Sequence, residues 1–250
     1  MEILTGSIQQ FLVDVFSKNI EKVGYSDLLL VESLTIDGKS SDGKRQFICF
    51  DELKLFKNLK YLELRNMVIS NYMIDILKEI TYLQNIVFMN CTFRKSIITL
   101  NVLQSVNLIR VESCKNFRLD YINNININYL TIAGSYIKTL LPLRGSHINV
   151  LDISRADFGD LINLDELDLQ KIVVGHDAYL KYEDLFMKSK IQVIVMANDG
   201  FYIEKFAYWY KKNKSWFNSC FCIYSWIFRI VFDIHPYSFQ EYFLMDMVYS

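Results

Sequence analysis

The chain has 250 residues, of which 52% are hydrophobic and 22% are charged, and its formal net charge is −1. This length and balance suit one large domain or two small ones with a sizeable apolar core. Near neutrality excludes the overall basic field that gathers nucleic acid or anionic membranes. With 9 glycines and 2 prolines, long flexible or proline-rich linkers are excluded too.

Cysteine usage and the N-terminus predict a reducing compartment. The five cysteines, at positions 49, 91, 114, 220 and 222, are odd in number and irregular in spacing, unlike a disulfide framework. The first residues, MEILTGS, contain no basic region followed by an apolar run, so a secretory signal is not expected. We therefore predict a cytoplasmic protein, and leave open export as an effector without a classical signal.

Residues 1–30 are predicted to form an N-terminal helical cap. Within residues 7–22, apolar side chains recur at helical spacing, and Ser7 is a suitable N-cap. The stripe consists of Phe11, Leu12, Val15, Phe16 and Ile20.

A pattern of eleven residues recurs after this cap. The segments Leu59–Ile69 and Leu83–Phe93 both have apolar residues at pattern positions one, four, six and eleven. The pattern resembles the strand segment of the leucine-rich repeat, L-x-x-L-x-L-x-x-N/C-x-L. Repetition at a fixed period indicates a solenoid, in which stacked units share one core that a single unit could not bury.

Eight copies of the pattern can be placed between residues 31 and 201. Their residues at positions one, four and six are Val31, Leu34, Ile36; Leu59, Leu62, Leu64; Leu83, Ile86, Phe88; Val106, Ile109, Val111; Ile127, Leu130, Ile132; Ile148, Leu151, Ile153; Leu169, Ile172, Val174; and Ile191, Ile194, Met196. Successive first positions are 28, 24, 23, 21, 21, 21 and 22 residues apart. The resemblance implies an α/β leucine-rich-repeat solenoid: a curved horseshoe with a concave parallel β-sheet and short helices or turns on the convex side.

The return segments between strands differ along the chain. Helical spacing of apolar residues predicts helices over Asn71–Thr81 and Tyr179–Lys188. The segments at 118–126, 138–147 and 157–166 are shorter and are expected to form single turns or 3₁₀ pieces.

Pattern position nine departs from the family, in which an Asn there ties adjacent coils together. The residues at this position are Lys39, Met67, Cys91, Cys114, Ser135, Ala156, Asp177 and Asp199. Cys91 and Cys114 are a known variant and are expected to be buried thiols. Met67 and Ala156 cannot donate side-chain hydrogen bonds, so their turns need other partners. We therefore expect an irregular solenoid without a continuous Asn ladder.

The loop Gly38–Arg45 is similar to a phosphate-binding P-loop that follows a strand. Arg45 replaces the Ser or Thr that would hold magnesium, and Gln46–Phe50 does not begin an obvious helix. A polar surface loop explains this segment better than a nucleotide site.

Residues 202–250 are predicted to form an aromatic-rich C-terminal cap, because the last 50 residues of the chain hold 18 of its 37 aromatic residues. Two alternatives are an apolar surface for a partner or for self-association, and a membrane-surface role for Tyr208–Phe232. The uncharged run Ser215–Phe228 is too short to span a membrane.

Convincing catalytic or metal-binding groups are not found. Cys220 and Cys222 form C-x-C, and neither a zinc nor a redox motif has this spacing. Cys220 with His235 as a base is an enzyme alternative, but only some 50 residues surround them. The carboxylates of Asp165, Glu166 and Asp168 are interpreted as a solvated face. No cofactor and no metal are predicted.

The outward residues of the concave strands are therefore the candidate binding site. Tyr and Arg are typical interaction hot spots, and mixed charge favours a protein ligand over nucleic acid. The candidates are Tyr61, Glu63, Arg65, Asn85, Arg110, Glu112, Tyr129, Thr131, Asp152 and Arg155. We predict a non-enzymatic protein-interaction module. Abundant Ile, Lys, Asn, Phe and Tyr suggest a low-GC, bacterial genome.

Overall fold

The computed structural model describes residues 24–39, 50–96, 99–103, 106–160, 164–196 and 202–203. The chain divides into two compact units, Met1–Glu204 and Lys205–Ser250, and the second lies outside the described residues. The predicted helix over residues 7–22 also lies outside them, as do Cys220, Cys222 and His235.

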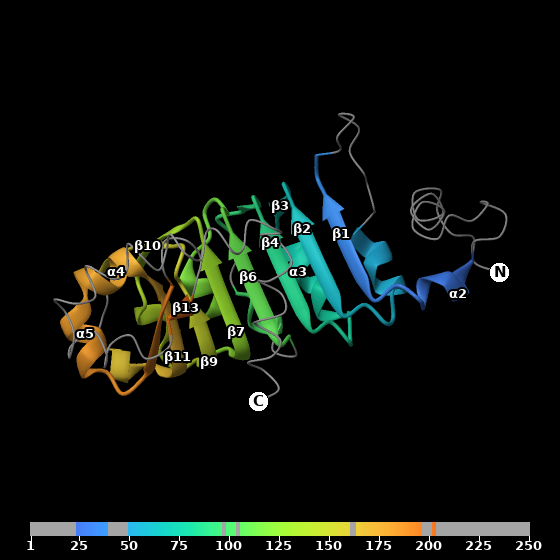
Figure 1. The fold of residues 1–250 in the computed structure, drawn as a ribbon. Helices are drawn as coiled ribbons and strands as arrows, with labels where there is room; N and C mark the ends of the chain where they lie inside the picture. Colours follow the sequence, from blue (N-terminus) through green and yellow to red (C-terminus); the bar gives the residue numbers. More distant parts are fainter. Residues whose placement is uncertain are drawn as a thin grey trace, which may run out of the picture. The chain divides into compact units, whose positions relative to one another are not determined.

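The first unit is built on one nine-stranded sheet (Figure 1). In spatial order its strands are β1 (Ser33–Asp37), β2 (Tyr61–Arg65), β4 (Asn85–Met89), β6 (Leu108–Glu112), β7 (Asn126–Ala133), β9 (His147–Asp152), β11 (Asp168–Gly175), β12 (Gln192–Met196) and β13 (Tyr202–Ile203). Neighbouring strands from β1 to β12 are parallel, and β13 is antiparallel to β12. Because β13 joins the sheet, the sheet continues past residue 201, where the predicted repeat region ends.

The strand register confirms the repeat pattern from the first copy to the seventh. The position-four residues pair across neighbouring strands, and each is at most 2% exposed. They are Leu34, Leu62, Ile86, Ile109, Leu130, Leu151 and Ile172. One strand per repeat and an unbroken apolar row beneath the sheet define a leucine-rich-repeat solenoid.

The eighth copy differs from the prediction by one residue. Ile172 pairs with Val193, Val173 with Ile194 and Val174 with Val195. Val193 and Val195 therefore occupy the inward positions, and Ile194 and Met196 turn to the opposite face. The prediction of Ile194 and Met196 as inward residues is wrong. The run VIVM contains no polar residue to mark a face, and a slip of one residue exchanges the two faces of a strand.

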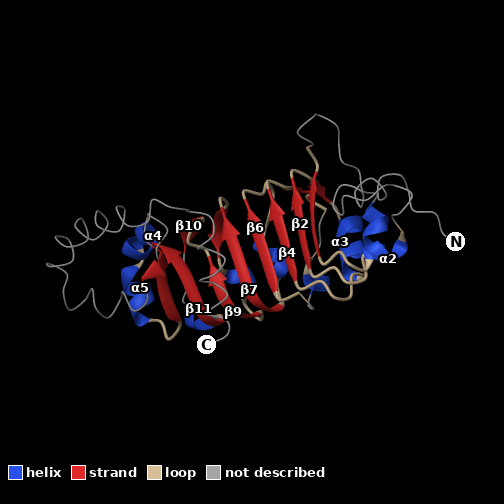
Figure 2. Ribbon diagram, turned by 45° about the vertical axis from the view of Figure 1, so that its right-hand side comes forward, coloured by secondary structure: helices blue, strands red, loops and turns tan. Residues whose placement is uncertain are grey.

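Helices and 3₁₀ turns lie on one side of the sheet (Figures 1 and 2). They are α2 (Tyr25–Leu28), η2 (Phe50–Leu55), α3 (Asn71–Lys78), η3 (Asn101–Leu103), η4 (Leu119–Ile122), η5 (Leu141–Leu143), η6 (Leu164–Glu166), α4 (His176–Lys181) and α5 (Glu183–Lys188). The helix over Asn71–Thr81 is confirmed, although it ends at Lys78, and so are the 3₁₀ pieces of the shorter repeats. Within the described ranges, no helix is long and apolar enough to cross a membrane.

The second predicted helix is two helices, because Tyr182 interrupts it. Tyr182 has a non-helical backbone (φ −120°, ψ 26°), and its hydroxyl donates a hydrogen bond to the carbonyl of Gly159 in the preceding repeat. This tertiary contact explains why helical spacing alone did not predict the break.

Two narrow parallel sheets form where the chain leaves the main strands. One pairs β3 (Val68–Ile69) with β5 (Thr92–Phe93), and the other pairs β8 (Tyr136–Thr139) with β10 (Asp157–Asp160). They place position eleven of several repeats in the core: Ile69 and Phe93 are 0% exposed. The centroid of the Phe93 ring lies 5.3 Å from the ring centroids of Phe88 and of Phe117, so aromatic side chains fill the interior here.

Candidate protein-binding face

Pattern positions three, five and seven point to the side of the sheet opposite the buried core. We call this side the open face. Strand register arranges it in rows, each with one residue per strand. The position-three row is Ser33, Tyr61, Asn85, Leu108, Tyr129, Val150, Lys171 and Gln192. The position-five row is Thr35, Glu63, Val87, Arg110, Thr131, Asp152, Val173 and Ile194.

The structure places all ten predicted partner-binding residues on or beside this face. Nine of them occupy positions three, five or seven of β2, β4, β6, β7 and β9: Tyr61, Glu63, Arg65, Asn85, Arg110, Glu112, Tyr129, Thr131 and Asp152. Arg155 follows β9 at position eight. Their role in binding stays a prediction, because position alone does not test it.

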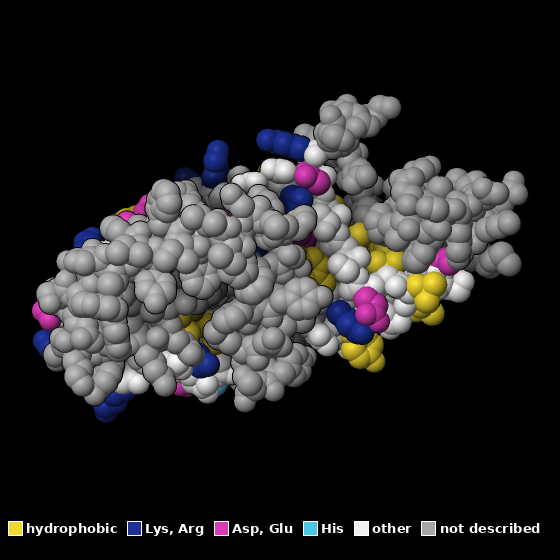
Figure 3. Space-filling view, in the orientation of Figure 1, with side chains coloured by type: hydrophobic (Ala, Val, Ile, Leu, Met, Phe, Trp, Pro, Cys, Tyr) yellow, Lys and Arg dark blue, Asp and Glu magenta, His cyan; other side chains and the backbone are white. Residues whose placement is uncertain are grey.

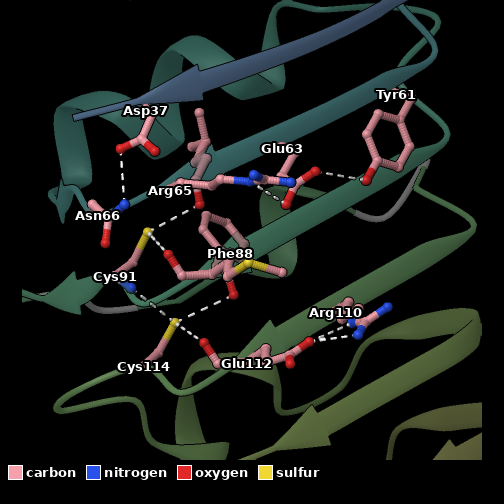
Figure 4. A network of polar contacts seen from close by, with 12 residues as sticks. Asp37, Tyr61, Glu63, Arg65, Asn66, Phe88, Cys91, Arg110, Glu112 and Cys114 are labelled. Atoms are coloured by element: carbon pink, nitrogen blue, oxygen red, sulfur yellow. Dashed lines mark hydrogen bonds and ion pairs between the residues drawn. The ribbon is translucent and has the colours of Figure 1, made fainter. Parts of the chain in front are cut away.

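Glu63 is the residue of this set whose surroundings differ most from expectation. It is 6% exposed, although an outward strand position predicts solvent. Tyr61 donates its hydroxyl to Glu63 Oε2 (3.1 Å), and Arg65 donates Nε to Glu63 Oε1 (2.7 Å), as Figure 4 shows. A buried carboxylate is costly unless it is paired and hydrogen-bonded, and both conditions hold here.

This contact also changes the two partners of Glu63. Burial, followed by the neighbouring Glu63 charge, raises the pKa of Tyr61 to about 12. The hydrogen bond to Glu63 raises the pKa of Arg65 above its ordinary value. Near neutral pH the face therefore presents a neutral phenol beside a permanent cation at β2.

A second charged group lies two strands further along. Arg110 donates Nε to Glu112 Oε2 (3.0 Å) and forms a further hydrogen bond to the same oxygen through Nη2 (Figure 4). The guanidinium of Arg155 lies 4.0 Å from the other oxygen of Glu112. Glu112 thus lies between arginines of two repeats and forms hydrogen bonds with Arg110.

Pattern position eight forms a turn that recurs in several repeats, which the apolar periodicity did not predict. Asn66, Asn90, Ser113 and Gly134 occupy it in the left-handed region, with φ between 52° and 58°. Their backbone N–H groups donate to carbonyls of the next repeat over 2.8–3.0 Å. The signal was present, since Asn and Gly tolerate positive φ best.

Gly38 occupies position eight of the first repeat. A Cβ there would lie 2.6 Å from the carbonyl oxygen of Asn66, and its N–H donates to the carbonyl of Arg65 (2.9 Å). Close backbone packing therefore accounts for this glycine of the P-loop-like segment. Residues 40–49 of that segment lie outside the described residues.

Cys91 and Cys114 take the place of the missing Asn at position nine. Both are buried, as predicted. The thiol of Cys91 donates to the Leu64 carbonyl (3.2 Å) and that of Cys114 to the Phe88 carbonyl (3.3 Å). The Cys91 N–H also donates to the Cys114 sulfur (3.3 Å). The hydrogen bond with Cys91, together with burial, raises the pKa of Cys114, so this thiol stays protonated.

Backbone hydrogen bonds stabilise the turns in which the position-nine side chain cannot form a hydrogen bond. The Met67 carbonyl accepts the N–H of Thr92 (2.8 Å), and the N–H of Ala156 donates to Ile153 (3.1 Å). The expectation that these turns find other partners is thus confirmed, and the partners are main-chain groups.

A stack of asparagines was missed at pattern position two. Asn128 donates its amide to the side-chain oxygen of Asn107, and Asn149 donates to that of Asn128 (2.5 Å). Side-chain amides suit such a stack because each carries both donors and acceptors. A short stack of three asparagines is therefore present at the entrance to these strands.

The open face becomes apolar toward its last strands. Val173, Ile194 and Met196 form a cluster in which each is at most 8% exposed, and Val150 packs against it. The shifted register of the eighth repeat creates this cluster, because it turns Ile194 toward Val173.

The carboxylates of Asp165, Glu166 and Asp168 are exposed and form hydrogen bonds or ion pairs at the surface. Asp165 accepts hydrogen bonds from Ser189 and from the Lys190 N–H, and Asp168 pairs with His147 (2.8 Å). Glu166 forms an ion pair with Arg144. Because all three side chains are exposed, the interpretation as a solvated face is confirmed, and these contacts link it to neighbouring repeats. Among the described residues, no three His, Cys, Asp or Glu side chains are grouped so that they could hold a metal ion.

No protein-family model and no curated protein matches this sequence. Among solved structures, the chain is similar to an internalin (inlF) from Listeria monocytogenes str. 4b F2365, with 16% identity and a TM-score of 0.39. That alignment covers 68% of this chain and 55% of the internalin. The chain is also similar to Listeria monocytogenes InlP, with 10% identity, a TM-score of 0.37, and coverage of 68% of this chain and 64% of InlP. It thus spans less than two thirds of either neighbour.

Proposed function

We propose that this leucine-rich-repeat solenoid binds a protein partner through its open face and acts by binding, not by catalysis. The observation that supports this most is the set of rows across β2–β9, where Tyr, Arg, Asn, Glu and Asp side chains share one side of a single sheet. Such a surface offers aromatic and guanidinium anchors on a rigid support.

The chemistry of the face favours a protein over other ligands. Arginines and carboxylates lie side by side on this face, as in the pairs Arg65–Glu63 and Arg110–Glu112. Figure 3 shows neighbouring side chains of both charge signs on the described part of the surface. Interspersed charge supports specific recognition of a complementary protein, whereas nucleic acid selects a basic surface. Tyr61 and Tyr129 lie in one row, separated by two intervening strands, so a partner can contact both aromatic side chains at once.

Preorganisation is a second argument for this face. Tyr61, Arg65 and Arg110 are already held by carboxylates of their own strands. Side chains fixed before binding lose less conformational entropy when a partner docks, which favours affinity.

Capture from a lysate of the source organism, with the full chain as bait, tests this proposal. The variant Tyr61→Ala/Arg65→Ala/Arg110→Ala/Tyr129→Ala should lose its partner, with an unchanged circular dichroism spectrum. The matched control is Tyr82→Ala/Tyr136→Ala/Arg118→Ala/Arg144→Ala. These four residues are exposed and lie outside the rows of the open face. Equal capture by both variants would refute binding through the open face.

Self-association through residues 202–250 is the second candidate, and their aromatic content supports it. Light scattering after size exclusion on a chain cut after Glu204, which keeps β13, tests it. A folded product that is still oligomeric would exclude the segment as the interface. Cytoplasmic location, a bacterial source and the absence of a cofactor stay predictions from the sequence.

A further inference from the structure

We infer that the open face between β2 and β9 recognises an extended, acidic segment of its partner. This rests on the proposed function and specifies the chemistry of the partner. The relevant residues are the arginines of three repeats, Arg65, Arg110 and Arg155.

The arginines and the carboxylates of this region differ in depth. The side chains of Arg65, Arg110 and Arg155 are 41%, 36% and 42% exposed. The carboxylates that pair with them are less exposed: the side chain of Glu63 is 8% exposed and that of Glu112 is 22% exposed. By formal charge the region is close to balance, but a molecule that docks on it meets guanidinium groups first.

Two further carboxylates lie at the borders of this region. Asp37 accepts the Asn66 amide (2.8 Å) and the Lys39 N–H (2.8 Å), and these bonds lower its pKa. Asp152 accepts both the N–H and the hydroxyl of Ser154 through one oxygen. With these two, the region holds four carboxylates and three guanidinium groups, so the inference rests on the greater exposure of the guanidinium groups and not on net charge.

The arginines keep unused donors. A guanidinium has five N–H groups, and in the described part of the chain Arg65 uses Nε on Glu63 while Arg110 uses Nε and Nη2 on Glu112. The remaining N–H groups can form paired hydrogen bonds with a carboxylate, the acceptor that guanidinium geometry fits best.

Spacing sets the length of the ligand. Arg65 on β2 and Arg110 on β6 are two strands apart, whereas Arg155 extends from the end of β9 back to Glu112 of β6, 4.0 Å away. The two strand spacings between Arg65 and Arg110, of about 4.8 Å each, amount to about 10 Å, which an extended chain covers with about three residues. Tyr61 and Tyr129 border the same stretch and add aromatic contacts.

The test uses fluorescein-labelled octapeptides of glutamate, glutamine and lysine, titrated with the full chain and followed by fluorescence anisotropy. The glutamate peptide should bind, at least tenfold more tightly than the glutamine peptide, and the lysine peptide should bind no better than glutamine. Affinity should fall as salt rises, because the contacts are between exposed charges.

Arginine variants locate the binding site. Arg110→Ala/Arg155→Ala should weaken glutamate-peptide binding at least tenfold. Arg118→Ala/Arg144→Ala removes two exposed, ion-paired arginines outside the open face and should leave it unchanged. Preference for the lysine peptide, no preference among the three, or equal losses in both variants would overturn the inference.

The capture experiment separates this inference from the proposed function. A captured partner that requires the open face but whose contacting segment is basic or uncharged refutes the acidic ligand and leaves the proposed function intact. A partner whose capture ignores the open-face substitutions refutes both.

Discussion

The two faces of the main sheet follow different rules. The inward face has the same pattern throughout: positions four and six are apolar in every repeat, and the strand register aligns them in continuous rows. The open face changes from strand to strand, from the buried Glu63 to the Arg110–Glu112 pair and then to the apolar cluster at Val173. The inward face determines the fold, and the open face is free to carry recognition.

The largest expected effect is a core substitution. Phe88 is 0% exposed and packs against Phe93, so Phe88→Ala should lower the free energy of unfolding by about 3–5 kcal/mol. Met89→Ala, one residue along but on the open face, should cost less than about 1 kcal/mol. Urea denaturation of both variants measures the contrast, and equal losses would contradict the assignment of faces.

Arg65→Ala should reveal an open-face residue that also stabilises the fold. It leaves the buried Glu63 without its ion pair, so we expect a loss of about 1–3 kcal/mol in the free energy of unfolding. Adding Glu63→Gln should restore part of that loss, because the uncompensated charge is gone. If the double variant is no more stable than Arg65→Ala, the buried charge is not the cause.

The turn after β6, which contains Cys114, should become less stable when the thiol is removed. Cys114→Ala removes the acceptor of the Cys91 N–H and the donor to Phe88, for an expected cost of about 1–2 kcal/mol. Cys114→Ser retains a donor and an acceptor and should cost less. Thermal denaturation ranks the two variants, and the reverse order would count against the hydrogen-bonding role.

A double-mutant cycle tests the register of the last repeat. Val173 and Ile194 are cross-strand partners in one cluster, so Val173→Ala and Ile194→Ala should be coupled by about 0.5–1 kcal/mol. Ile172→Ala and Ile194→Ala lie on opposite faces and should be additive. Coupling of the second pair in place of the first would restore the register that the pattern predicted.

The smallest effect concerns the acidity of Tyr61. Its pKa of about 12 in the fold lies above the ordinary 10.0, so the neutral phenol favours folding. That stabilisation is complete below pH 10 and is lost as pH rises through about 12. Glu63→Gln should lower the pKa of Tyr61 but keep it above 10, because burial is the larger cause. Carbon-13 NMR titration of labelled tyrosine, assigned with Tyr61→Phe, measures it.

Much of this architecture could be predicted because the inward face is periodic. Leu62 and Leu64 alternate with polar residues, which marks both the strand and its buried side. Four consecutive apolar residues from Val193 to Met196 carry no such mark, and there the prediction was wrong.

Placement of the candidate site followed from the same periodicity, but its contacts did not. Alternation places Glu63 on the open face, whereas its burial depends on how Tyr61 and Arg65 orient around it. The Asn stack at position two depends on side chains 21 residues apart, which become neighbours only after the repeats are aligned.

With the corrected register, the later repeats all have the same length. Leu130, Leu151, Ile172 and Val193 are equally spaced by 21 residues and pair in order. If one such unit were removed or duplicated, each remaining strand could still pair in register with the next one. The solenoid can therefore grow or shrink by whole units, each changing the width of the open face by about 4.8 Å. Insertion and deletion in the gene then become a way to fit this surface to a longer or shorter ligand.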